Sequence, residues 1–127
     1  MNKKVIKTDK VSLPVGPYNQ AVAIGGLVYT AGQIPLDKQG NMVPGGIKEQ
    51  TEQVIQNLIA VLGTAGSSLD KVVKATVFLK DLNDFAGMNE VYAKYFKAAI
   101  APARSTLQVS RIPKDSLVEI EVVAQIQ

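Results

Sequence analysis

Hydrophobic and polar positions follow two different periods along the chain, and each change of period marks the edge of an expected element. Residues 70–80 (DKVVKATVFLK) alternate with period two, which is typical of a strand with one buried face. One side of that strand would carry Val73, Ala75, Val77 and Leu79, and the other side Lys74, Thr76, Phe78 and Lys80. Residues 4–8 predict a first strand, and residues 21–34 (AVAIGGLVYTAGQI) predict a hairpin that turns at Gly25 and Gly26.

Two helices are expected, because the period changes to the helical one in two segments. In residues 47–64 the repeating apolar positions are Ile47, Val54, Leu58, Val61 and Leu62, followed by a stop signal at Gly63 and Gly66. A second helix is expected to begin near Asn83 or Asp84, since either side chain can cap it. Its apolar stripe consists of Phe85, Met88, Val91, Tyr92, Tyr95 and Phe96.

The last part of the chain predicts two strands separated by a turn at residues 113–116 (PKDS). Alternation in the first places Arg104, Thr106, Gln108 and Ser110 on one face, and in the second it places Glu119 and Glu121 together. If the strands pair as a hairpin, residues whose numbers sum to about 230 lie opposite one another. We then expect no direct ion pair between Arg104 and Glu119, although both can border one cavity on the polar face.

Together these elements predict one α+β domain over residues 1–127, with six strands and with both helices on one face of the sheet. The other sheet face is not expected to be wholly polar, since Val28 and Phe78 are among the apolar residues that can project from it. This favours an oligomer in which sheets pack against each other.

Composition narrows the possible chemistry. The chain has 127 residues, a net charge of +3, no cysteine and no histidine. Disulfides and thiol nucleophiles are therefore excluded, and the usual metal ligand and neutral-pH general base are missing. The lysines are scattered, so we expect no nucleic-acid partner, and no signal-peptide or membrane-spanning pattern is found, so we expect a cytoplasmic protein.

Several residues are candidates for a site, each with an ordinary structural alternative. Arg104 has the planar group that binds a carboxylate with two hydrogen bonds, but it can equally be a solvated charge. Glu119 can be a surface carboxylate, and Tyr18, on a loop stiffened by Pro14 and Pro17, can be a packing residue. Gly32 permits a close approach or a bulge, and Asn89 alone would be read as solvent-facing.

Four segments resemble the reactive intermediate deaminase (Rid) family in the right order and spacing. They are GPYNQA, TAGQIP, TVFLKDLNDFAGMNEVY and PARSTLQVSRIPKDSLVEIEVVA, and the resemblance covers essentially the whole chain. It implies a chorismate-mutase-like fold with a mostly antiparallel sheet. It also implies a homotrimer in which the sheets form a central barrel, with three clefts between subunits. The implied activity is hydrolysis of 2-imino acids, such as 2-iminobutanoate and 2-iminopropanoate, to 2-keto acids and ammonia, without cofactor or metal.

The resemblance also implies roles for individual residues. Arg104 matches the arginine that binds the substrate carboxylate, and Glu119 matches the carboxylate thought to orient or activate the attacking water. The implied substrate-binding residues also include Tyr18, Ala31, Gly32, Asn89 and Thr106. Ala31 stands where the family often has serine and Thr106 where cysteine is frequent, which leaves the hydrogen bond at position 31 in doubt.

Other functions remain open at this point. The same cleft can bind 2-keto acids as a regulatory module without turnover. A ribonuclease or translation inhibitor is a further alternative, which the missing histidines and scattered lysines support little. A chaperone-like role would use exposed apolar surface.

Overall fold

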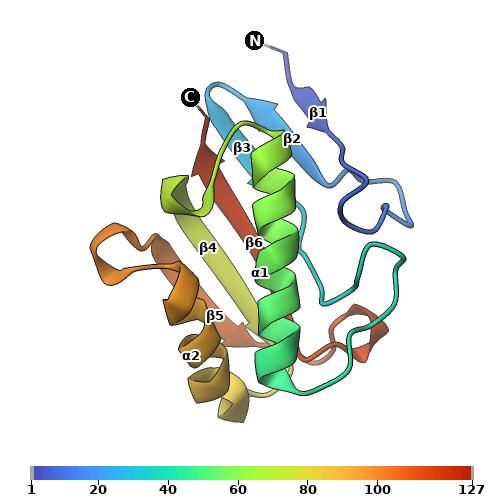
Figure 1. Ribbon diagram of the computed structural model, residues 1–127, viewed down its shortest axis with the longest axis vertical. Helices are drawn as coiled ribbons and strands as arrows, with labels where there is room; N and C mark the ends of the chain where they lie inside the picture. Colours follow the sequence, from blue (N-terminus) through green and yellow to red (C-terminus); the bar gives the residue numbers. More distant parts are fainter. Residues whose placement is uncertain (1, 127) are drawn as a thin grey trace.

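A computed structural model describes residues 2–126, and six strands in these residues form one sheet. The strands are β1 (Lys4–Ile6), β2 (Ala21–Ile24), β3 (Leu27–Thr30), β4 (Val72–Leu79), β5 (Ala103–Gln108) and β6 (Val118–Gln125). Both helices, α1 (Ile47–Thr64) and α2 (Phe85–Tyr95), lie on one face of this sheet (Figure 1). The predicted α+β class and the bounds of the first helix are therefore confirmed.

The core fills the space between the sheet and the helices. α1 contributes Val54, Leu58, Val61 and Leu62, all without exposed surface, and β4 and β6 contribute the buried sides of their alternating patterns. α2 adds Met88, Val91 and Tyr92 from its predicted stripe. Neither helix within residues 2–126 combines the length and apolar character needed to cross a bilayer.

The start of each helix uses a cap that alternation does not reveal. Glu49 accepts a hydrogen bond from the Gly46 N–H at 2.8 Å and so closes the first turn of α1. Before α2, Asp81 accepts from the Asn83 N–H at 2.8 Å and caps a short 3₁₀ turn. α2 begins directly after Asp84, its N-cap residue, as predicted, but neither Asn83 nor Asp84 caps it through its side chain, so the predicted side-chain cap is wrong.

The strand order is β1-β2-β3-β6-β4-β5, and it contradicts the predicted final hairpin. β5 pairs with β4 in parallel, with Arg104 opposite Ala75, while β6 lies between β3 and β4 in antiparallel pairing. The reason is that α2 connects β4 to β5, and a helical crossover returns the chain in the same direction. The segment 109–117 then carries the chain past β4 to its other side.

Two residues lie on the opposite side from the one predicted. The β4–β6 register shifts between Val72 and Lys74, so the bulge exposes Val73, which retains 50% of its surface. Val28 is fully buried on the helix side, because β3 pairs with β2 and β6 in a register that turns Tyr29 outward instead. Phe78 does face the open side, as predicted, in register with Glu119.

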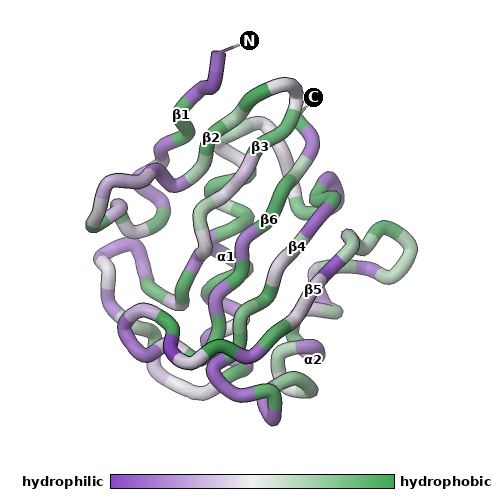
Figure 2. The backbone as a smooth tube through the Cα atoms, turned by 180° about the vertical axis from the view of Figure 1, so that it is seen from behind, coloured by the Kyte–Doolittle hydropathy of each residue, from purple (hydrophilic) through white to green (hydrophobic). Residues whose placement is uncertain are grey.

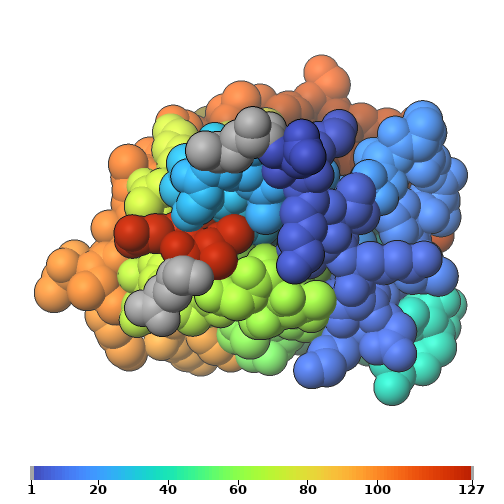
Figure 3. Space-filling model, turned by 90° about the horizontal axis from the view of Figure 1, so that it is seen from above, coloured from blue at the N-terminus to red at the C-terminus, as the bar shows by residue number. Residues whose placement is uncertain are grey.

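Figure 2 views the sheet from the face without helices, with hydrophilic and hydrophobic residues along its strands. Ile24, Tyr29 and Leu107 project from this face with 38%, 41% and 39% of their surfaces exposed. At one end of the molecule the β2–β3 turn lies between β1 and the end of β6, and the end of α1 lies beside them (Figure 3). There the Ile126 N–H donates to the Gly26 carbonyl at 2.8 Å, and the Ser67 hydroxyl donates to the Gln125 carbonyl at 2.7 Å.

Candidate functional site

A cleft of about 810 Å³ opens where β3 ends and β6 begins. Its walls come from the loop 12–20, from the segment 31–40 that follows β3, from the turn at Pro113 and Lys114, and from Glu119. Four predicted site residues therefore meet here: Tyr18, Ala31, Gly32 and Glu119.

Glu119 and Gly32 are adjacent because residue 33 pairs with residue 120. The Gln33 N–H donates to the Ile120 carbonyl at 2.8 Å, and the Ile120 N–H donates to the Gln33 carbonyl at 3.1 Å. A Cβ atom added to Gly32 would lie 1.9 Å from Oε2 of Glu119 and 2.7 Å from its Cδ. The glycine at position 32 thus leaves the space that this carboxylate occupies.

The Glu119 carboxyl is electrostatically unusual. Burial in the cleft wall raises its pKa above the ordinary glutamate value, and the negative charge of Glu121 on the same face raises it further. A half-buried carboxylate with a raised pKa is suited to accepting a proton from a bound water near neutral pH.

The other cleft walls are fastened to the core. Asn57 of α1 donates to the carbonyls of Ile34 and Leu36 at 3.2 and 3.0 Å, which fixes the segment after β3. The side-chain oxygen of Gln50, also on α1, accepts from the Leu117 N–H at 2.8 Å and holds the start of β6. The cleft residues are therefore placed by α1 and not only by their own loops.

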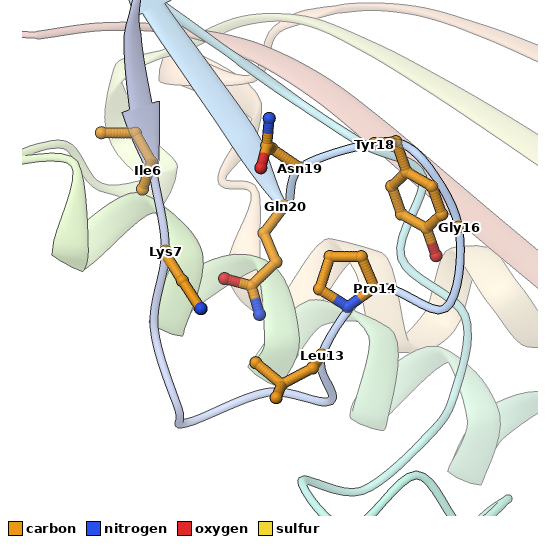
Figure 4. A pocket seen from close by; sticks show the side chains of 8 residues that line it. All are labelled: Ile6, Lys7, Leu13, Pro14, Gly16, Tyr18, Asn19 and Gln20. Carbon is orange, nitrogen blue, oxygen red and sulfur yellow. The ribbon is translucent and has the colours of Figure 1, made fainter.

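Gln20 fixes the loop that carries Tyr18. Its side-chain amide donates to the carbonyls of Thr8 and Ser12 at 3.0 and 3.1 Å, and its oxygen accepts from the Thr8 N–H at 2.7 Å. Figure 4 shows this side chain reaching into the loop, with the ring of Tyr18 beside Gly16 on the far side. Tyr18 keeps 52% of its surface exposed, so it borders the cleft and is not a core residue.

Arg104, Thr106 and Asn89 form a second group, at the edge of the sheet next to α2. The guanidinium carbon of Arg104 lies 4.7 Å from the centroid of the Tyr92 ring and 5.6 Å from that of Phe85. The Thr106 hydroxyl is buried and has no hydrogen-bond partner among residues 2–126. Asn89 is half-buried. It lies four residues after Phe85 and three before Tyr92, so all three share one face of the helix.

These two groups do not come together within one chain. Arg104 is level with Ala75, whose side chain is fully buried under the helices, whereas Glu119 is level with Phe78 on the open face. The expectation that Arg104 and Glu119 share one face of the same chain is therefore wrong. The parallel pairing of β5 is the physical reason, since it sets the side of the sheet to which Arg104 points.

Sequence reasoning missed several residues around these groups. Phe85 and Tyr92 were assigned only to the core, although their spacing places them on the Asn89 face. Lys38 and Lys114 line the cleft, and Lys114 takes a left-handed conformation at φ 57° in the PKDS turn. No group of three or more acidic side chains within the described residues is arranged to hold a metal ion.

The chain matches known proteins over nearly its whole length. The endoribonuclease L-PSP family model matches residues 9–126. A RutC family protein of Pyrococcus abyssi is 55% identical, over 98% of this chain and 98% of its own. The mouse 2-iminobutanoate/2-iminopropanoate deaminase is 45% identical, over 96% and 90% of the two chains.

A solved structure shows that the fold is also similar to that of a known protein. The crystal structure of Escherichia coli TdcF with bound serine superimposes with a TM-score of 0.90 at 42% identity, covering 98% of this chain and 99% of that one. The resemblance to Rid proteins that the sequence motifs indicated is confirmed. The chain belongs to the endoribonuclease L-PSP family, which includes the RutC and Rid proteins.

Proposed function

We propose that this protein hydrolyses reactive 2-imino acids, such as 2-iminobutanoate and 2-iminopropanoate, to 2-keto acids and ammonia. The observation that carries the proposal is the Glu119 carboxylate, which is half-buried over Gly32 in a cleft and has a raised pKa. Support also comes from the mouse relative, which is named as a deaminase for these two imino acids.

The active site would be completed by a second copy of the chain. Arg104 and Glu119 lie on opposite faces of the sheet, so one molecule does not place them around one substrate. The open face carries apolar side chains that a neighbouring copy can cover, including Tyr29 and Leu107. We propose a homotrimer in which each cleft takes Glu119, Gly32 and Tyr18 from one copy and Arg104, Thr106 and Asn89 from the next.

Arg104 would bind the substrate carboxylate through two parallel N–H···O hydrogen bonds, which places C2 of the iminium group beside a water. Glu119 would accept a proton from that water as its oxygen bonds to C2 and the C=N π electrons move to nitrogen. The same proton would then pass from Glu119 to the amine. The C–N bond then breaks as the hydroxyl proton passes to Glu119 and the carbonyl forms, and the leaving ammonia takes that proton from Glu119, so no other reactant is needed.

This chemistry asks little of the protein. Protonated imines react with water unaided, so positioning and one proton transfer would be sufficient, each worth a few kcal/mol of barrier lowering, or roughly a hundredfold or more in rate. On the arginine side we assign Thr106 backbone contact with the substrate, because its hydroxyl is buried. Ala31 has no side-chain hydrogen bond to offer, so on the glutamate side we assign it backbone contact only.

A coupled assay tests the proposal. Threonine dehydratase generates 2-iminobutanoate in the presence of semicarbazide, which traps the imine, and the purified protein is added. We expect the wild type to suppress semicarbazone formation and Arg104→Ala to fail. Lys97→Ala, an exposed basic residue outside both groups, is the matched control and should behave like the wild type. If the wild type does not suppress trapping, imine hydrolysis is excluded, and calorimetry with 2-ketobutyrate then tests keto-acid binding without turnover.

A further inference from the structure

We propose that Tyr92 is a positioning residue for the reaction, because its ring and that of Phe85 form an aromatic shelf that holds the Arg104 guanidinium ready for a carboxylate. The inference rests on the proposed function in one respect, namely that Arg104 binds the substrate carboxylate. It adds two residues of α2 to the site, and neither contacts the reacting atoms in this arrangement.

The geometry of the shelf is that of a cation over aromatic faces. The guanidinium carbon lies 4.7 Å from the Tyr92 centroid and 5.6 Å from the Phe85 centroid, both within the roughly 6 Å over which such contacts attract. β5 brings Arg104 to the sheet edge, and α2 packs beside β5, so two separate elements fix the two partners (Figure 1). A lone arginine on an edge strand would otherwise sample many rotamers.

The shelf differs from the usual way in which a protein holds an arginine. The ion pairs within residues 2–126 are Lys48–Glu90 and Arg111–Asp115, and neither includes Arg104. A carboxylate partner would occupy the same N–H donors that a substrate needs. A contact of the cation with an aromatic face does not require these in-plane N–H donors. The shelf can therefore orient Arg104 without competing with the substrate.

Tyr92 itself has little freedom. It retains 6% of its surface, and its ring stacks on Phe96 with centroids 4.3 Å apart and an interplanar angle of 23°. Burial raises the pKa of its phenol, although the positive charge of Arg104 and a hydrogen-bond interaction with its guanidinium act in the opposite direction. Its buried hydroxyl makes no hydrogen bond of good geometry with any described residue, so that interaction is weak. We therefore assign the positioning role to the ring and not to the hydroxyl.

The role predicts a specific kinetic signature. The substrate carboxylate is bound by Arg104 equally before and during water attack, so losing the shelf weakens both states alike. KM then rises while kcat changes little. A residue that only supports the fold has the opposite effect, because misfolded molecules lower the apparent kcat and leave the KM of the remaining ones unchanged.

The experiment compares three variants with the wild type in the coupled imine assay and in calorimetry with 2-ketobutyrate. Tyr92→Phe keeps the ring, and we expect KM and Kd within about twofold of wild type. Tyr92→Leu removes the ring, and we expect both constants to rise about tenfold with kcat within about threefold. Phe85→Leu, at a site that is 41% exposed and so less damaging to the fold, should raise both constants by a smaller factor.

The outcomes separate this inference from the proposed function. If the wild type binds 2-ketobutyrate but does not hydrolyse imines, the deaminase proposal fails. The shelf is then tested only by comparing the Kd of the variants for 2-ketobutyrate with that of the wild type. If Tyr92→Leu and Phe85→Leu both keep the wild-type Kd, the shelf is overturned while the deaminase proposal stands. A lowered kcat with unchanged KM in both variants would likewise overturn it, as would a wild type that binds no keto acid.

Discussion

Gly32→Ala is the sharpest perturbation of the cleft, because it moves the Glu119 carboxylate, which we propose as the general base, without changing it. The new Cβ would lie 1.9 Å from Oε2 of Glu119, whereas ordinary contact begins at 3.4 Å. The carboxylate must therefore retreat by about 1.5 Å, and a misplacement of about 1 Å can cost about a hundredfold in rate. Loss of general-base catalysis altogether would cost about a hundredfold to ten-thousandfold, which corresponds to roughly 3–5 kcal/mol of barrier.

The free energy of unfolding should change little in this variant. The clash is with the far end of a flexible side chain, which can rotate away into the cleft. Residue 32 does not require a left-handed backbone, so alanine introduces no strain and reduces the entropy of the unfolded chain. We expect a change in stability within about 1 kcal/mol, measured by urea unfolding.

The assay is steady-state kinetics on the imine, with two controls. Gly63→Ala adds the same methyl group on α1, where nothing lies within 4 Å, and it should keep full activity. In a Glu119→Ala background, Gly32→Ala should cause no further loss of kcat, since the group that it displaces is gone. Full kcat in Gly32→Ala, or additive losses in the double variant, would refute the reasoning.

Four more outcomes follow from the same structure. Glu121→Gln removes a negative charge that raises the pKa of Glu119. Because the base works when it is deprotonated, the acid limb of the pH profile of kcat should move to lower pH. An unchanged acid limb would argue against Glu119 as the base. Arg104→Lys keeps the charge but loses the two-pronged contact, so KM for the imine should rise about ten- to a hundredfold in the coupled assay. Leu107→Asp places a charge on the open face and should give a smaller particle in size-exclusion chromatography than the wild type. Leu58→Ala empties fully buried space and should destabilise the fold by about 2–5 kcal/mol in urea unfolding.

The elements were predictable wherever one periodicity persisted. α1 runs over its predicted residues because its apolar stripe is long and ends at a glycine stop. The pairing of β5 was not obtained, because adjacency in sequence suggested a hairpin with β6. The signal for the correct answer was present in the strand–helix–strand order around α2, which normally gives parallel neighbours.

The sequence predicted which residues form the candidate site, but not that they lie in two separate groups of one chain. Alternation places Arg104 and Glu119 on strand faces, yet only the strand order decides whether those faces are the same. The contact of Glu119 with Gly32 depends on a bridge between residues 33 and 120 that has no local sequence signal. Nor could spacing show that Tyr92 lies under Arg104, since its apolar periodicity already had a sufficient explanation in the core.

The central claim is that Arg104 and Glu119 serve one substrate from two different copies of the chain. The most direct test mixes Arg104→Ala and Glu119→Ala proteins, each inactive alone, and refolds them together from urea. If each cleft takes one residue from each of two neighbours, random assembly restores about one quarter of the wild-type activity. Activity that stays at the level of the separate variants would contradict a site shared between copies.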